Sequence, residues 1–92
     1  MFSFFLVRDR SMAPSVSDGD VVFASSLFHP RPGDIAIVRD PLDAERLLIK
    51  RIVRIEKENC WVEGDNKGLS CDSRQFGYIP LHLVLGRAWN MA

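Results

Sequence analysis

The apolar residues of this chain fall into short β-rich runs that are separated by turn signals. No segment carries the apolar period of about 3.6 residues that marks an amphipathic helix. Two of the runs follow Gly-Asp turns, at Gly19-Asp20 and Gly33-Asp34, and these residue types are typical of tight turns between strands. The pattern predicts a small all-β fold of short twisted antiparallel strands.

Strands are expected over residues 2–8, 20–25, 34–39, 46–55 and 60–63, and at the end of 79–89 after a brief turn around Pro80. Residues 46–55 and 60–63 form a β-hairpin with a four-residue connection, 56–59. Residues 64–77 form a polar loop, and loops of this length are often functional in compact domains. A length of 92 residues fits a single domain, 1–92.

Composition excludes several classes of function. Twelve Lys and Arg residues balance twelve Asp and Glu residues, so no overall positive field attracts nucleic acid. Cys60 and Cys71 lack the CxxC spacing of a zinc site, so neither a metal nor another cofactor is expected. Cys60 is interpreted as a small buried apolar residue. With nine Arg and only three Lys, the chain offers few amines for chemistry.

Residues 1–7 are apolar and run directly into Arg8. This segment is too short to span a bilayer, and it lacks the basic start of a signal peptide. We therefore interpret it as the first strand, and we expect no transmembrane segment and a cytoplasmic location. The alternative is peripheral contact with a membrane surface through Phe2, Phe4 and Phe5.

Ser11 is the candidate nucleophile, because it lies between the first strand and the turn at Gly19. A serine hydroxyl needs an adjacent base to react at neutral pH. The two histidines, His29 and His82, lie in no recognisable triad motif. The plainer interpretation of Ser11 as an ordinary turn residue stays open on these residues alone.

Lys50 is the candidate base, since it lies in an apolar strand with Leu48 and Ile52 on its own face. Burial disfavours the ammonium form and lowers the pKa of a lysine, so a buried amine can act as a base near neutral pH. Arg51 cannot play this part, because arginine stays protonated. Both faces of the strand are largely apolar, so the pattern does not distinguish a buried Lys50 from an exposed one.

A series of short motifs occurs in an order that resembles one peptidase family. The motifs are Ser11-Met12-x-Pro14, Gly19-Asp20, Gly33-Asp34, Lys50-Arg51, Gly64-Asp65-Asn66, Ser70-x-Asp72-Ser73-Arg74, Phe76-Gly77 and Gly86-Arg87. From about Val7 to Arg87 the chain resembles the signal peptidase I family, and this resemblance implies a signal-peptidase-like or LexA-like β fold. Within the family it most resembles the nickel-type superoxide dismutase maturation proteases.

The resemblance implies a Ser/Lys dyad, in which Ser11 is the nucleophile and a neutral Lys50 takes its proton. Ser70 matches the family serine that hydrogen-bonds and orients the catalytic lysine. Asp72 and Arg74 match a structural pair that ties the loop beside the site, because arginine offers a rigid fork to a carboxylate.

Other motif residues take supporting roles in the same resemblance. Asp65 and Asn66, together with Gly64, shape the turn that returns Ser70 to the lysine. Met12 packs beneath the nucleophile and lines the substrate pocket.

One departure from the family lies at Asp9, two residues before the nucleophile. The family commonly has Ser or Gly at this place. A serine there donates to the oxyanion, beside the backbone N–H of the nucleophile, which is the N–H of Ser11 in this chain. A carboxylate cannot donate and opposes a developing negative charge. Asp9 therefore either points away, toward Arg8 or Arg10, or slows the reaction.

These inferences predict a serine endopeptidase that removes an N-terminal propeptide from a precursor protein. The resemblance implies a nickel superoxide dismutase precursor as the substrate, and no nucleic acid partner is expected. Two alternatives stay open: a signal peptidase that acts on other precursors, and a non-catalytic β module that binds an extended peptide by strand addition. A self-cleaving LexA-type repressor is disfavoured, because the chain shows no DNA-binding domain.

Overall fold

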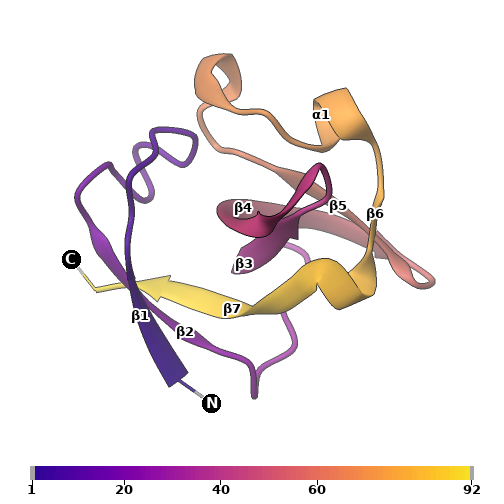
Figure 1. Ribbon diagram of the computed structural model, residues 1–92, viewed down its shortest axis with the longest axis horizontal. Coiled ribbons are helices and arrows are strands. Elements are labelled where there is room, and N and C mark those ends of the chain that lie inside the picture. Colours follow the sequence, from indigo (N-terminus) through magenta and orange to yellow (C-terminus); the bar gives the residue numbers. More distant parts are fainter. Residues whose placement is uncertain (1, 92) are drawn as a thin grey trace.

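The chain forms one antiparallel sheet, and across the described residues, 2–91, the strand order is β1-β2-β7-β3-β4-β5-β6 in this computed structural model (Figure 1). The strands are β1 (Phe2–Leu6), β2 (Val21–Ser25), β3 (Ile35–Asp40), β4 (Asp43–Glu56), β5 (Asn59–Glu63), β6 (Ile79–Pro80) and β7 (Val84–Asn90). The helical segments are η1 (Lys67–Leu69), α1 (Ser73–Phe76) and η2 (Leu81–Leu83). The prediction of a small all-β fold of short antiparallel strands is confirmed.

The predicted strands are present. The structure adds β6 at Ile79–Pro80, where a brief turn was predicted, because these two residues pair with Cys60 and Asn59 of β5. The other differences lie at the strand ends. The longest strand, β4, runs from Asp43 to Glu56 and so extends beyond the predicted 46–55. The β4–β5 hairpin is also present, but its connection is shorter than predicted, because Glu56 pairs with Asn59. Lys57 turns the chain there in the left-handed region, with a φ of 57°.

The polar segment 64–77 is not a plain loop, since it contains η1 and α1. Asp72 caps α1 in a capping box: its side chain accepts from the first turn, and Gln75 reaches back to the Asp72 backbone N–H. Helices this short leave no apolar period in the sequence, and for that reason the pattern predicted none.

Two clusters of buried side chains form the core, and β3 contributes to both. The first cluster contains Val7, Met12, Val16, Val22, Ala24, Ile37, Ile49 and Ala88. The second contains Ala36, Val38, Ile52, Cys60, Val62 and Ile79. Because side chains alternate along a strand, Ile37 enters one cluster while its neighbours enter the other. Cys60 is buried as predicted, and this burial raises the pKa of its thiol to about 11.

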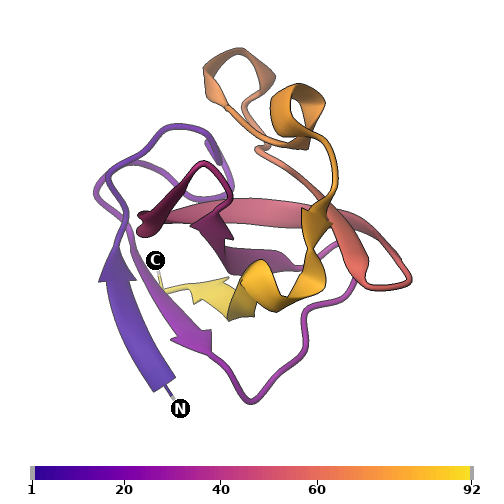
Figure 2. The ribbon, with the colours of Figure 1, turned by 45° about the vertical axis from the view of Figure 1, so that its right-hand side comes forward.

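Segments that are far apart in the sequence meet at one end of the molecule. Residues 7–20 and 64–78 both lie above the sheet in the views of Figure 1 and Figure 2. They are joined directly, because the backbone N–H of Asn66 donates to the carbonyl oxygen of Ser11 at 2.8 Å. The fold therefore brings together the two segments that carry most of the predicted site. No helix within residues 2–91 is long and apolar enough to cross a membrane.

Candidate active site

Ser11 begins a turn just after β1, and its side chain is almost fully buried, at 1% exposure. The turn is fixed from below by Met12, which is fully buried in the first core cluster. It is fixed from above by the hydrogen bond from Asn66 to the Ser11 carbonyl oxygen. The predicted position of Met12 beneath the nucleophile agrees with this packing.

Lys50 lies in the middle of β4, and only 2% of it is exposed. The structure thus decides the question that the apolar pattern left open, in favour of a buried amine. Burial lowers the pKa of Lys50 from its ordinary value, while the negative charges of Asp9 and Asp72 oppose the shift. The amine is therefore closer to neutrality at physiological pH than that of a surface lysine.

Ser70 links Lys50 to a buried carboxylate. The Lys50 amine Nζ donates to Ser70 Oγ at 3.0 Å. Ser70 Oγ in turn donates to Asp72 Oδ2 at 2.6 Å. This chain of contacts fixes the end of a flexible side chain, which is the geometry that an orienting serine requires.

Asp72 is anchored by Arg74, as the resemblance implied. Arg74 donates from Nε to Oδ1 at 3.0 Å and from its terminal guanidinium nitrogen to Oδ2 at 2.6 Å. The backbone N–H of Gly64 also donates to Oδ2, at 2.8 Å. Burial alone would raise the pKa of Asp72, but the hydrogen bonds from Arg74, Ser70 and Gly64 outweigh it and hold that pKa well below its usual value. Asp72 is therefore a fixed negative charge behind Ser70.

Gly64 lies between the two halves of the site. A Cβ at this position would overlap both the Ser70 hydroxyl and the carbonyl oxygen of Ser11. Only glycine permits backbone and side chain to approach this closely. The turn at Gly64 thus sets how near Ser70 comes to the nucleophile loop.

Asp65 has a role that the sequence did not reveal. Its carboxylate accepts from Arg51 at 2.9 and 2.7 Å and from Ser15 Oγ at 2.6 Å. The hydrogen bond from Arg51 lowers the pKa of Asp65. Asp65 therefore ties β4, the nucleophile loop and segment 64–78 together. Alternation placed Arg51 on the face opposite Lys50, but no sequence signal identified its partner.

Asp9 faces the nucleophile. Asp9 Oδ1 accepts from the backbone N–H of Ser11 at 2.9 Å, and Oδ2 accepts from Ser11 Oγ at 3.1 Å. The alternative in which Asp9 points away toward a neighbouring arginine is wrong, because the backbone curls so that the carboxylate caps the turn. The Ser11 hydroxyl thus hydrogen-bonds to Asp9, whereas the Lys50 amine hydrogen-bonds to Ser70. The negative charge of Asp9 also acts on Lys50, where it opposes the lowering of the pKa.

Two hollows open beside these residues. The site hollow, of about 380 Å³, is lined by Lys50, Asp9, Leu48, Arg46 and Cys71, among others. The middle hollow, of about 270 Å³, lies between residues 5–9 and residues 46–49. Met12 lines neither of them, so the predicted part of Met12 in the substrate pocket does not follow from this geometry.

The two histidines lie apart from these hollows. His29 and His82 line a separate hollow with Pro80 and Glu58. In the part of the chain that the structure describes, no group of three or more His, Cys, Asp or Glu side chains could hold a metal ion.

Known proteins with similar sequences are peptidases. The family described as signal peptidase, peptidase S26, matches residues 1–55. The chain is 33% identical over 109 residues to the mitochondrial ATP-independent inner membrane protease subunit 1a of Arabidopsis thaliana, a match that covers 89% of this chain and 65% of the relative. It is 32% identical over 101 residues to the mitochondrial inner membrane protease subunit 1 of Mus musculus, covering 84% of this chain and 61% of the relative. It is 34% identical over 108 residues to subunit 2 of that protease from Danio rerio, covering 89% and 59%.

These relatives correct two expectations. All three are inner membrane proteases by name, so the predicted cytoplasmic location is wrong and the relatives point to association with a membrane. The prediction rested on the composition of residues 1–7, and composition there does not decide membrane association, because a protein can also reach a membrane surface by interfacial contacts. None of the three is named as a superoxide dismutase maturation protease, so the comparisons support the family and not that finer resemblance. The chain spans between 59% and 65% of the length of these relatives.

Proposed function

Because the chain belongs to the signal peptidase family, peptidase S26, a family of serine peptidases, we propose that it is a serine endopeptidase with a Ser11/Lys50 dyad. Its reaction is the removal of an N-terminal extension from a precursor protein. The observation that carries the proposal is a buried Lys50 with a lowered pKa, hydrogen-bonded to Ser70 at the end of the molecule where Ser11 lies.

The reaction begins when the substrate carbonyl displaces Asp9 from Ser11. The carbonyl oxygen then takes the hydrogen bond of the Ser11 backbone N–H, and the hydroxyl turns from Asp9 to the neutral amine of Lys50. Ser11 Oγ forms a bond to the carbonyl carbon as Lys50 takes the hydroxyl proton. The backbone N–H stabilises the resulting oxyanion.

Collapse of this intermediate breaks the C–N bond, and the Lys50 ammonium gives its proton to the leaving amine. The first product departs with its new amino terminus, and an ester on Ser11 remains. Lys50, neutral again, takes a proton from water as the water attacks the ester. The proton then returns to Ser11 Oγ as the second product leaves, so one water is consumed in each cycle.

Ser70 and Asp72 support Lys50 while it carries the proton. The fixed charge of Asp72, relayed through Ser70, stabilises the ammonium that forms after the proton transfer. Burial acts in the opposite direction, since it favours the neutral base before the transfer. The two effects keep the amine able both to accept and to release a proton.

Two kinds of precursor are candidate substrates. The sequence resemblance suggests a nickel superoxide dismutase precursor. The names of the relatives instead suggest a precursor that is processed at a membrane. We favour the second kind, because the relatives support it and the outer face of β1 is apolar.

The outer face of β1 presents aromatic side chains to solvent. Phe2 and Phe4 are exposed, and both contact Phe23, with ring centroids 5.4 and 5.3 Å apart. Phe23 in turn lies 5.8 Å from Trp89. Phe5 points to the opposite face and packs against the first core cluster, so it does not belong to this surface. Exposed aromatic side chains of this kind suit the interface of a lipid bilayer.

The membrane contact is tested by vesicle flotation. We expect the wild-type protein to float with phosphatidylglycerol-containing vesicles and the Phe2→Ser/Phe4→Ser variant to stay at the bottom. Leu42→Ser removes an exposed apolar side chain elsewhere and is the matched control. Equal flotation of all three proteins would count against this face.

The peptidase itself is tested by intact-mass spectrometry of precursors incubated with the protein. Two substrates are compared: a nickel superoxide dismutase precursor and a precursor with an apolar presequence. The Ser11→Ala variant is the control with each substrate. A single shortened product that needs Ser11 supports the peptidase and identifies the substrate class. Binding of a precursor without any cleavage would instead favour the non-catalytic β module.

A further inference from the structure

Three hollows adjoin one another, and each shares lining residues with the next. The site hollow shares Asp9, Arg46 and Leu48 with the middle hollow. The middle hollow shares Phe5 and Ile37 with a third one, which we call the far hollow. Because neighbours share walls, the three hollows lie in a row that starts at Lys50 and ends at Ser3 of β1, and we call this row the groove.

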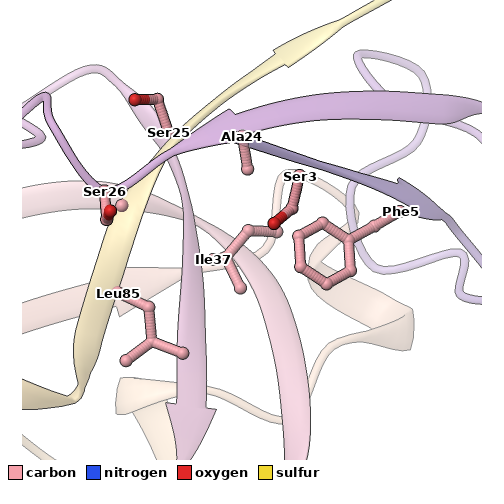
Figure 3. Close-up of a pocket in the computed structure, with 8 residues that line it drawn as sticks. Ser3, Phe5, Ala24, Ser25, Ser26, Ile37 and Leu85 are labelled. Carbon is pink, nitrogen blue, oxygen red and sulfur yellow. The ribbon is translucent and has the colours of Figure 1, made fainter. Parts of the chain in front are cut away.

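The far hollow has about 160 Å³ and is built mainly of carbon. Its walls include Ser3 and Phe5 of β1, Ala24 of β2, Ile37 of β3, and Leu85 and Gly86 of β7. Figure 3 shows Ser3, Phe5 and Ile37 pointing toward one another, with Leu85 at the side. Apolar cavities of about 150 Å³ hold a group as large as benzene, so the far hollow has room for one aliphatic or small aromatic side chain.

The length of the groove is set by β1 and the residues that follow it. Ser3 lines the far hollow, Phe5 lines both it and the middle hollow, and Asp9 lines both the middle and the site hollow. Asp9 lies six positions after Ser3, and an extended chain rises by about 3.3 Å per residue. The groove thus matches about six residues of an extended substrate, or roughly 20 Å.

We propose that the far hollow is a subsite for an apolar side chain of the substrate, about six positions to the amino-terminal side of the cleaved bond. The proposal rests on the proposed peptidase function. A segment of this length must be unfolded to lie in the groove, and the N-terminal extension meets that condition. On the other side of the cleaved bond the mature protein begins, and its folded part cannot lie extended in the groove.

The subsite is tested with two series of peptides that share one cleavage sequence. In the first series, a leucine is placed at each of the third to ninth positions before the cleaved bond, in an otherwise Ser/Gly background. In the second, the leucine is placed after the bond. We expect kcat/KM to rise about tenfold when the leucine is near the sixth position before the bond, mainly through KM. No position of the second series should have this effect.

Variants of the protein link the preference to the far hollow. Leu85→Ala removes an apolar side chain that lines the far hollow. Ser3→Phe instead fills the hollow with a larger side chain from the exposed strand β1, and it leaves no cavity in the core. Both should bring the ratio of kcat/KM between leucine and serine peptides close to one. Leu83→Ala is the matched control, because Leu83 packs against the second core cluster and lines none of the three hollows. Thermal unfolding of each variant separates loss of the subsite from loss of the fold.

Fluorescence anisotropy with the Ser11→Ala variant keeps the subsite distinguishable from catalysis. Suppose that the affinity for labelled peptides depends on the leucine but the wild-type protein cleaves no peptide. This result supports the subsite and refutes the peptidase function. If cleavage proceeds but neither rate nor affinity depends on the leucine, the subsite is refuted and the peptidase function stands. A preference on the carboxyl side of the bond, or one that Ser3→Phe leaves intact, also refutes the proposal.

Discussion

Replacing Asp9 by serine should accelerate the peptidase. In the resting state the Ser11 backbone N–H donates to Asp9 Oδ1 at 2.9 Å, so the donor that the oxyanion needs is already occupied by a carboxylate. The substrate must break this hydrogen bond before it can use the donor. Hydrogen bonds to charged groups contribute about 1.5 to 3 kcal/mol, which corresponds to roughly 10- to 150-fold in rate.

The lower part of that range applies, because Asp9 is only half-buried and water can replace part of the lost bond. We therefore expect Asp9→Ser to raise kcat/KM by about tenfold, and more if the new hydroxyl donates to the oxyanion. Removing the carboxylate also removes a charge that raises the pKa of Lys50. The rise of rate with pH should then occur at lower pH in the variant than in the wild type.

The assay measures kcat/KM on one peptide substrate across a pH series for Asp9→Ser, Asp9→Gly and Asp9→Asn. Asp9→Asn keeps the shape of the side chain and removes its charge, so it separates charge from size. Circular dichroism and thermal unfolding confirm that each variant is folded. An unchanged or lower rate in both Asp9→Ser and Asp9→Gly would refute the reasoning, because it would mean that the carboxylate is harmless or useful.

Three further predictions follow from the site. The wild-type rate should rise with pH through the pKa of Lys50, which burial lowers, because only the neutral amine is a base; a pH–rate profile that is flat from pH 5 to 10 would contradict this. Gly64→Ala should reduce cleavage at least 100-fold while substrate binding persists, since its Cβ would push Ser70 away from the lysine; wild-type kinetics would show that the close approach is unimportant. Iodoacetamide should modify exposed Cys71, which lines the site hollow, and inhibit the enzyme, whereas buried Cys60 stays unmodified; peptide mapping and the resistance of Cys71→Ser check both points.

The sequence predicted the fold well, because its strands are marked by local signals. Gly-Asp turns precede β2 and β3, and the charged residues around Lys57 mark the hairpin. The ends of the strands were predicted less well, because they depend on backbone hydrogen bonds to neighbouring strands and not on composition. The pairing of Glu56 with Asn59, for example, shortened the hairpin connection.

The sequence predicted less of the site, because the decisive facts are contacts between distant segments. Alternation could not tell whether Lys50 is buried, since both faces of the strand are largely apolar around it, and its partner Ser70 lies in a segment distant in sequence. The partner of Asp65 is Arg51, which is separated from it by most of a hairpin. The direction in which Asp9 points is set by the backbone of a turn, so charge alone suggested the wrong partner.

The most direct test of the central claim, that a neutral Lys50 deprotonates Ser11, is the cleavage rate of Lys50→Arg. Arginine keeps a positive charge and stays protonated in proteins, so it cannot accept the proton. Lys50→Met, of similar length and without charge, controls for the folding of a buried position. The account predicts that both folded variants cleave a precursor peptide no faster than Ser11→Ala does. Wild-type rates in Lys50→Arg would contradict it.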